Sequence, residues 1–399
     1  MEEKKAKPIL LYQGIQLQSY EQVGTDSLTA GTTRNRLNLD QELEDPIDDK
    51  QDEEEQLPPE MVEKLNQLAG TLLTHWEINV NAIELIQGGQ MALVWKLATD
   101  KGPLCLKRIH RPEKKALFSI YAQDYLAKKG CRVPRIIANK SGSLYTKQGP
   151  FLYVVYDWII GRVFNDQIEE DLTWMMKGLA DYHTESIGYL PPEGTPVFSK
   201  LGKWPSHYIK RCQQMDTWKL IAAQFPDDPF STVYLQEIDA FIRYGEALID
   251  ELNHSCYFNW VEKVKESPNL CHQDYGTGNT LLSDRSGNTD IWLIDLDTTS
   301  FDLPIRDIRK IVIPLMNDRG TWDADYFHHM IASYENFHPL TSEEKRVLYI
   351  DMLFPYELYS VVQNKFGRKG ESSLDELEQA FAFERTKKDE ITRILRAES

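Results

Sequence analysis

The hydrophobic pattern of this chain changes character near residue 160, and this change limits the fold more than any other feature of the sequence. Before residue 160, the apolar residues come in short runs rich in β-branched and aromatic side chains. Three such runs follow one another at 80–86, 91–98 and 103–109. Turn-forming residues, Gly88-Gly89 and 100–102, separate them. Runs of this length between turns predict a three-stranded antiparallel sheet.

Helical periodicity surrounds these strands and dominates the rest of the chain. Helices are predicted where apolar residues recur three and four positions apart, namely at 61–76, 113–129, 171–183 and, as long helices, 205–266. Further strands are expected at 135–138, 152–158 and, as two short strands after a loop, within 270–297. The predicted fold class is α+β, with a small antiparallel β N-lobe, a large helical C-lobe and a cleft between them.

The first 58 residues differ in composition from the remainder. They hold 14 acidic and 6 basic residues, and nine of the acidic ones fall between Glu42 and Glu55. So polar a segment buries too little apolar surface to offset the entropy of ordering, and we expect an acidic, disordered tail over 1–58. A solubilising tail and an interaction arm are both open as its role.

The whole chain is acidic, with a net charge of −17. This argues against nucleic acid and anionic membrane surfaces as partners, because both bind proteins through basic faces. No run approaches the ~20 apolar residues of a transmembrane helix. The five cysteines are scattered, with no C-x-x-C pair, which argues against a disulfide framework or a structural zinc site.

One loop contains the residues that point to chemistry. His272, Asp274 and Asn279 form an H-x-D-x-x-x-x-N pattern, and Asp295 follows sixteen residues after the Asn, at the end of a predicted strand. In phosphoryl transfer, an Asp accepts the proton of the attacking hydroxyl, while an Asn and a second Asp hold magnesium. Carboxylate and amide oxygens are the ligands that magnesium prefers. The pattern therefore predicts a phosphotransferase site.

Two other features fit this chemistry. Lys107 lies within an apolar predicted strand, after the turn at Gly88-Gly89. A kinase site uses such a lysine to hold phosphates and a flexible turn to lie over them. Alone, Lys107 also fits a solvent-facing strand lysine, and the two glycines fit an ordinary hairpin. Within the catalytic loop, we expect Gly276 and Gly278 to let the chain bend tightly enough to aim the acidic and amide side chains at one point.

The spacing after Asp295 indicates the kind of acceptor. Asp307 follows Asp295 by only twelve positions, and the chain has no H-R-D, D-F-G or A-P-E sequence. A protein kinase needs a long activation segment at this place to build its peptide platform. A small-molecule acceptor is therefore favoured over a protein.

Longer stretches around these residues show a family resemblance. They are QMALVWK at 90–96, the run 105–130, NLCHQDYGTGNTLL from Asn269, IDLDTTSFDLPIRDIRK from Ile294 and FPYELY from Phe354. They are similar to the CotS/CotI family of bacterial spore coat proteins, within the aminoglycoside phosphotransferase/choline kinase-like superfamily. The resemblance covers about residues 60–390.

The resemblance implies a protein-kinase-like fold, with the N-lobe and hinge over 59–160 and the helical C-lobe, which holds the catalytic loop and metal site, over 161–399. It implies ATP and Mg²⁺ as cofactors. It also implies synthesis in the mother-cell cytoplasm, deposition in the spore coat, and other spore coat proteins as partners.

Matched positions also carry roles over from the family. Lys107 would bind phosphates, Asp274 would be the catalytic base, and Asn279 and Asp295 would hold magnesium. Gly88-Gly89 would form the turn over the nucleotide.

The remaining matched positions support the site. The strand that ends with Tyr156 and Trp158 would be the hinge whose backbone pairs with adenine. His272 would orient the loop by hydrogen bonds. For Asp297, a second metal contact and a loop-bracing role are both open. Asp307 would be a buried structural acid.

One position departs from the family pattern. Active relatives orient the phosphate-binding lysine with a helix Glu, and that place falls on Ser119 in this chain. Glu113 and Asp124 lie on the same predicted helix but out of register. Two functions are therefore weighed. The favoured one is an MgATP-dependent phosphotransferase for an unknown small hydroxylated molecule, with an acceptor pocket built by 162–265. The alternative is a catalytically weak or inactive structural component of the endospore coat.

Overall fold

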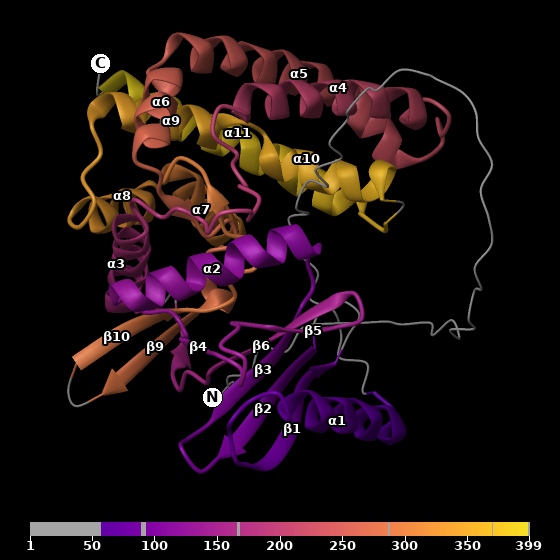
Figure 1. Ribbon diagram of the computed structural model, residues 1–399. Helices are drawn as coiled ribbons and strands as arrows, with labels where there is room; N and C mark the ends of the chain where they lie inside the picture. Colours follow the sequence, from indigo (N-terminus) through magenta and orange to yellow (C-terminus); the bar gives the residue numbers. More distant parts are fainter. Residues whose placement is uncertain (1–56, 89–92, 166–167, 286–287, 369, 398–399) are drawn as a thin grey trace, which may run out of the picture.

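A computed structural model describes residues 57–88, 93–165, 168–285, 288–368 and 370–397 (Figure 1). The predicted tail lies outside the described residues, apart from residues 57 and 58. The strands are β1 (Val80–Gly88), β2 (Leu93–Thr99), β3 (Leu104–Ile109), β4 (Ile136–Ile137), β5 (Thr146–Gln148), β6 (Phe151–Asp157), β7 (Arg162–Val163), β8 (Leu270–Cys271), β9 (Thr280–Arg285), β10 (Asn288–Leu293) and β11 (Ser300–Phe301). The α-helices are α1 (Pro59–Leu73), α2 (Glu113–Lys129), α3 (Glu169–Glu185), α4 (Trp204–Ala222), α5 (Pro229–His254), α6 (Tyr257–Glu266), α7 (Ile305–Asp318), α8 (Ala324–Glu335), α9 (Ser342–Leu353), α10 (Tyr356–Val362) and α11 (Leu374–Ala397).

The N-lobe is an antiparallel sheet in the order β1-β2-β3-β6-β4, with β5 also paired to β6. The predicted meander is thus confirmed as β1-β2-β3, and β6 extends it. Lys107 on β3 is paired with Val94 on β2 and Val154 on β6, which places it in the middle of the sheet.

Alternation along the strands divides the apolar side chains between two faces of this sheet. Leu106 and Val155 pack with Trp76 and Trp95 in a core that α1 covers. Their neighbours, including Val154, pack instead with residues of α2. Because successive strand residues point to opposite faces, Lys107 lies on the face opposite Leu106. That face is the one turned toward α2 and the C-lobe (Figure 1).

The predicted helix over 113–129 matches α2, and the chain leaves it at Gly130 with φ +92°. The helix predicted over 61–76 is instead α1, which ends at Leu73. The reason is a tertiary contact. The N–H groups of His75 and Trp76 close tight turns on Leu72 and Leu73, and the buried Trp76 indole donates to the Ile137 carbonyl at 2.8 Å. That bond draws the chain toward β4 and away from the helix axis.

Most of the C-lobe is helical, and one large apolar core joins its helices. The long helical region predicted over 205–266 is three helices, of which α4 and α5 run along each other (Figure 1). The loop and short strands predicted over 270–297 are β8, β9 and β10, with β7 added to the edge of β9. The α+β fold class is therefore confirmed, with the β-rich and helical parts segregated.

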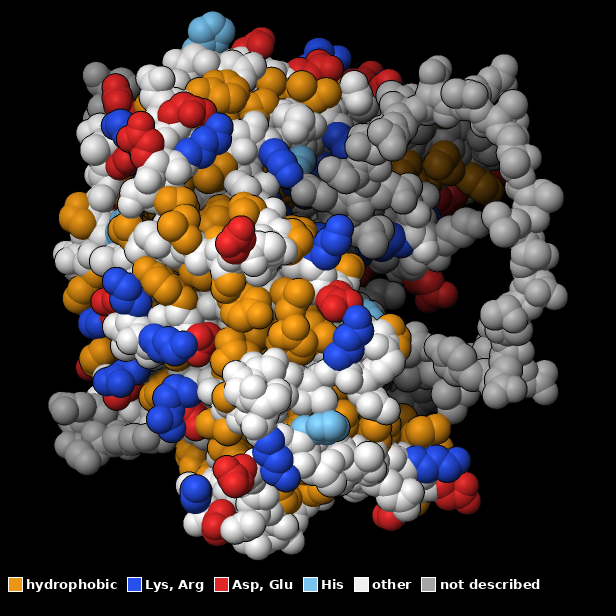
Figure 2. Space-filling model, viewed as in Figure 1, with side chains coloured by type: hydrophobic (Ala, Val, Ile, Leu, Met, Phe, Trp, Pro, Cys, Tyr) orange, Lys and Arg blue, Asp and Glu red, His pale blue; other side chains and the backbone are white. Residues whose placement is uncertain are grey.

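On the face that Figure 2 shows, Lys and Arg side chains are interspersed with Asp and Glu. In the described part of the chain, no helix combines the length and the apolar character needed to cross a membrane.

Candidate active site

The loop 272–279, in which the sequence predicts the catalytic residues, follows β8 and brings its acid and amide side chains together. The Nδ2 of Asn279 donates to the backbone oxygen and to Oδ2 of Asp274, both at 2.8 Å. The exposed Asp274 carboxylate is thereby fixed, and the Asn279 amide nitrogen is used within the loop. The neighbouring protein atoms remove part of the hydration of Asp274 and raise its pKa, while the charges of His272 and Lys310 oppose that rise.

The glycines of this loop do not have the role expected of them. Gly276 is extended, with φ −178°, and a Cβ at Gly276 or Gly278 would meet no atom within 4 Å. The non-glycine residues with positive φ are Gln273 at +68° and Asp295 at +59°. The tight bends are therefore made at Gln273, which precedes Asp274, and at Asp295 itself, and both residues carry a steric cost there.

A buried carboxylate anchors the start of the loop. Asp307 on α7, with no exposed surface, accepts the backbone N–H of His272 at 2.6 Å and that of Gln273 at 2.8 Å. Its Oδ2 also lies 3.1 Å from Nε2 of His183, whose Nδ1 meets the Tyr334 hydroxyl at 2.8 Å. Burial alone would raise the pKa of Asp307, but the hydrogen bond from His183 and the other donors hold it below the usual value.

The His272 side chain joins the loop to the segment that follows β10. Because a carbonyl only accepts, His272 Nε2 donates to the Ile294 oxygen, at 3.0 Å. The Ile294 N–H in turn donates to the Asn279 carbonyl at 2.9 Å. Ile294 is thus held on both sides, and Asp295 follows it. The sequence-based role of His272 as an orienting residue fits these contacts.

Lys107 reaches this segment from the N-lobe. Its Nζ lies 2.7 Å from Oδ1 of Asp295 and 3.0 Å from Oδ2 of Asp297. Burial alone would lower the pKa of Lys107, but the two carboxylates raise it above its ordinary value. Loss of hydration tends to raise the pKa of Asp295 and of Asp297, and the positive charge of Lys107 tends to lower both. The effect of Lys107 is the larger at Asp295, whose pKa is lowered. The loss of hydration is the larger at Asp297, whose pKa is raised.

Helix α2 supplies no carboxylate to Lys107 among the contacts of the described residues. Ser119 is buried, and its hydroxyl donates to the Ala116 carbonyl at 3.1 Å. Glu113 pairs with Lys147 at 2.7 Å, and Asp124 pairs with Lys128. Within the described structure, helix α2 therefore provides no carboxylate for Lys107, as Ser119 indicated in the sequence. Asp295 and Asp297 contact the Lys107 ammonium instead.

The expected nucleotide-covering turn and hinge are described only in part. Gly88 ends β1 opposite Leu93, whereas Gly89 lies outside the described residues. Tyr156 is paired on both sides, with Cys105 and with Ile136. The N–H of Trp158 donates to the Pro103 carbonyl at 3.3 Å. The backbones of the two named hinge residues are thus engaged within the N-lobe.

The donor set around the loop fits magnesium. Asn279 retains its side-chain oxygen for a ligand, since its nitrogen is bonded to Asp274. Asp295, whose side chain is 44% exposed, offers carboxylate oxygens from the next segment. Hard oxygens, with space for water, are what magnesium binds. A second group that has metal-ligand residue types, His183, Cys271 and Asp307, is fully buried, and its hydrogen bonds serve the loop.

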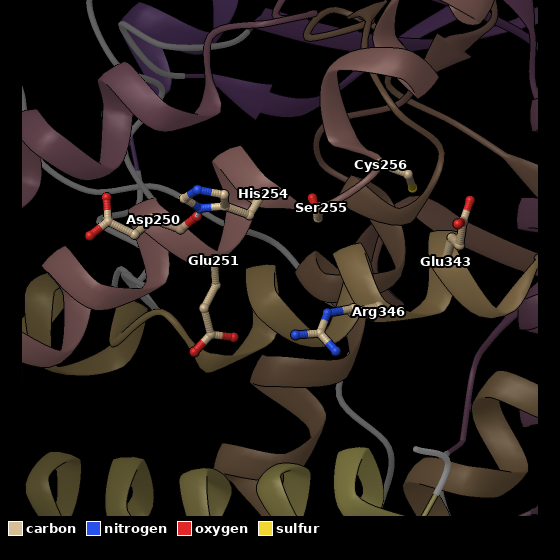
Figure 3. A pocket seen from close by; sticks show the side chains of 7 residues that line it. All are labelled: Asp250, Glu251, His254, Ser255, Cys256, Glu343 and Arg346. Carbon is tan, nitrogen blue, oxygen red and sulfur yellow. Dashed lines mark hydrogen bonds between the residues drawn. The ribbon is translucent and has the colours of Figure 1, made fainter.

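A pocket of about 390 Å³ lies elsewhere, between the end of α5, the start of α6 and α9 (Figure 3). It is lined by Asp250, Glu251, His254, Ser255, Cys256, Glu343 and Arg346. Its lining includes no residue of the catalytic loop. The pocket thus lies apart from Asp274, although part of its lining falls in the 162–265 insert.

Comparison with known proteins identifies the family. The family model described as "Spore coat putative kinase YutH" matches residues 81–397, which is most of the chain. The chain belongs to this family. Spore coat protein S of Bacillus subtilis (strain 168) is 27% identical over 300 residues, which cover 75% of this chain and 84% of that protein. Endospore coat-associated protein YutH of the same strain is 23% identical over 191 residues, 47% of this chain and 53% of that protein. The resemblance to the CotS-like family is confirmed.

A solved structure shows the same fold. An aminoglycoside phosphotransferase from Alicyclobacillus acidocaldarius superposes with a TM-score of 0.68 at 16% identity, covering 87% of this chain and 98% of that one. This member of the spore coat family therefore has the aminoglycoside phosphotransferase-like fold.

Proposed function

We propose that this protein is an ATP- and Mg²⁺-dependent phosphotransferase that acts on a small hydroxylated molecule and is located in the coat of a bacterial endospore. One observation supports the enzyme above all others. Lys107 from the N-lobe meets Asp295 from the C-lobe at 2.7 Å, next to a loop in which Asn279 holds Asp274. These are the residue types that phosphoryl transfer requires, joined from positions 188 residues apart in sequence.

Each residue has a role set by its contacts. Asp274 accepts the proton of the acceptor hydroxyl, and its raised pKa moves it toward the range in which a carboxylate is an effective base. Asn279 and Asp295 hold magnesium, which when bound neutralises charge on the phosphates. Lys107 binds the phosphates from the opposite side. Adenine pairs with hinge backbone groups other than the Trp158 N–H, because Pro103 already accepts from that group.

The acceptor is small in this proposal. Between Asp295 and the start of α7 at Ile305 the chain forms only the short strand β11, so there is no platform for a peptide. Location in the coat and other coat proteins as partners are supported by the names of the relatives, spore coat protein S and endospore coat-associated protein YutH. Synthesis in the mother-cell cytoplasm is part of the same proposal.

The alternative function is a coat component without turnover. It is supported by Ser119, because the usual helix carboxylate is missing. Nucleotide binding distinguishes the two. An inactive coat component does not need to bind a nucleotide. The enzyme must bind one, and it should lose that binding when Asp295 is removed.

The test is thermal unfolding with and without millimolar MgATP. Ligand at 100 times its dissociation constant adds about 2.7 kcal/mol to the free energy of unfolding, a shift of a few degrees in Tm. We expect this shift in the wild type and in Asp290→Ala, a control on β10 whose carboxylate pairs with Arg132. We expect no shift in Asp295→Ala. A well-folded wild type that does not shift would exclude the enzyme, and a shift would justify a screen of acceptors by ADP release.

A further inference from the structure

In protein kinases the phosphate-binding lysine must be held in place by a helix carboxylate. Helix α2 does not provide one, since Ser119 is buried against its own helix and the acids of α2 pair with other lysines. In spite of this, the Lys107 ammonium has a defined position. The group that defines it must therefore come from another element.

The segment after β10 presents two acids to Lys107, and they differ in exposure. The side chain of Asp295 is 44% exposed, and its backbone is in the left-handed region, which is expected of a residue directed at a ligand. The side chain of Asp297 is 14% exposed, which is close to the 12% of Lys107 itself. The contact of Lys107 with Asp295 is the shorter, at 2.7 Å against 3.0 Å, but the Lys107–Asp297 pair is the more buried one, so water screens it less.

Metal binding separates the two acids further. A metal held by Asp295 takes up the charge of that carboxylate, and its attraction for Lys107 then falls. Asp297, two residues later, stays within 3.0 Å of Nζ.

We propose that Asp297 is the positioning residue for Lys107 and replaces the missing helix carboxylate. This inference rests on the nucleotide site proposed above. It has a structural consequence, because the orienting group now belongs to the same segment as the metal-binding Asp295. Lysine and metal ligand are set by one segment of the C-lobe, and the placement of Lys107 does not depend on the position of α2.

The first measurement is calorimetric binding of ADP in the presence of Mg²⁺, because a metal on Asp295 leaves Asp297 as the carboxylate that holds Lys107. Asp297→Asn keeps the shape of the side chain and removes its charge. Loss of a charged hydrogen bond predicts about tenfold or more weaker ADP binding. The matched control is Asp290→Asn, which removes an exposed carboxylate of β10 and leaves ADP binding unchanged. If the Asn variant does not fold, Asp297→Ser replaces it.

The second measurement needs no nucleotide. It follows the acetylation rate of Lys107 at pH 8 by peptide mass spectrometry. Because Asp297 holds the buried Lys107 ammonium at 3.0 Å, its removal frees the amine to move and makes it more accessible to the reagent. We expect faster acetylation in Asp297→Asn and a rate like that of the wild type in Asp297→Glu and Asp290→Asn.

The outcomes separate this inference from the proposed function. A wild type that does not bind ADP overturns the nucleotide site, and the acetylation rates still report whether Asp297 holds Lys107. Unchanged ADP affinity together with unchanged acetylation in Asp297→Asn overturns the inference alone. Equally fast acetylation in the Glu and Asn variants does so too, because the charge would then have no part in holding the lysine.

Discussion

Asp307→Asn tests how the catalytic loop is held without any assumption about substrate. The carboxylate accepts from two backbone amides, those of His272 and Gln273, and from His183. Asparagine has one accepting oxygen and would turn an N–H toward one of these donors. The loss of a hydrogen bond to a charged group costs about 1.5–3 kcal/mol, and an orphaned buried amide costs about 1–3 kcal/mol more.

We therefore expect Asp307→Asn to lower the free energy of unfolding by about 3–5 kcal/mol, the range found when one partner of a buried charged pair is removed. That is a large share of the 5–15 kcal/mol that a typical domain has. The assay is urea unfolding followed by tryptophan fluorescence at pH 7. Asp290→Asn is the control and should change stability by less than about 0.5 kcal/mol.

The pH dependence gives a second check. The pKa of Asp307 is lower in the folded protein than in the unfolded chain, where it is about 3.9. Its stabilisation is therefore present above about pH 4 and is lost as the pH falls through the lower, folded value. The difference between wild type and Asp307→Asn should be constant from pH 7 to 5 and shrink in stronger acid. A difference below about 1 kcal/mol at pH 7 would show that the loop is anchored by other contacts.

Three further changes have defined expectations. Gly276→Ala should change the urea midpoint little, within about 0.5 kcal/mol, because the backbone is extended and a Cβ has space; a large loss would restore the tight-bend role that the sequence suggested. Gly130→Ala should cost about 1–2 kcal/mol in the same assay, because φ is +92° at the end of α2, and no loss would show that the cap relaxes. Lys310→Met should raise the pKa of Asp274 further, because the positive charge of Lys310 opposes the rise in the wild type. The acid limb of the pH–rate profile should move to higher pH, as should the carboxyl titration followed by NMR without substrate. An acid limb that does not move would contradict the assignment of Asp274 as the base.

The parts of the fold that the sequence predicted well depend on local signals. Helix α2 was predicted at its observed bounds because the helical pattern of 113–129 stops at Gly130, a residue type that commonly ends helices. The β1-β2-β3 meander follows from short apolar runs between turns. The end of α1 was predicted wrongly, because the Trp76 indole bonds to Ile137, a residue 61 positions away that no local pattern reveals.

The candidate site shows the same division. The H-x-D-x-x-x-x-N spacing gives the residues of the loop, and in the structure the Asn279 amide donates a hydrogen bond to Asp274. The family pattern places the carboxylate that orients Lys107 on α2, but Ser119 occupies that position and the acids of α2 pair with other lysines. Its contacts with Asp295 and Asp297 depend on how the two lobes meet, which spacing along the chain does not encode. The His183–Asp307 contact escaped prediction for the same reason, although a histidine on a buried apolar stripe was the available signal.

The two functions considered for this chain make different demands on its acids. Asp307 is buried and holds backbone amides, so folding alone would require it and its presence does not distinguish them. Asp295 is different, because it is half exposed and occupies a left-handed backbone position at φ +59°. Such positions cost of order 1 kcal/mol or more, and they cluster where a ligand is held. In a coat protein without turnover, a glycine at position 295 would give the same backbone turn without the strain. The backbone at Asp295 therefore favours a nucleotide site over a purely structural module.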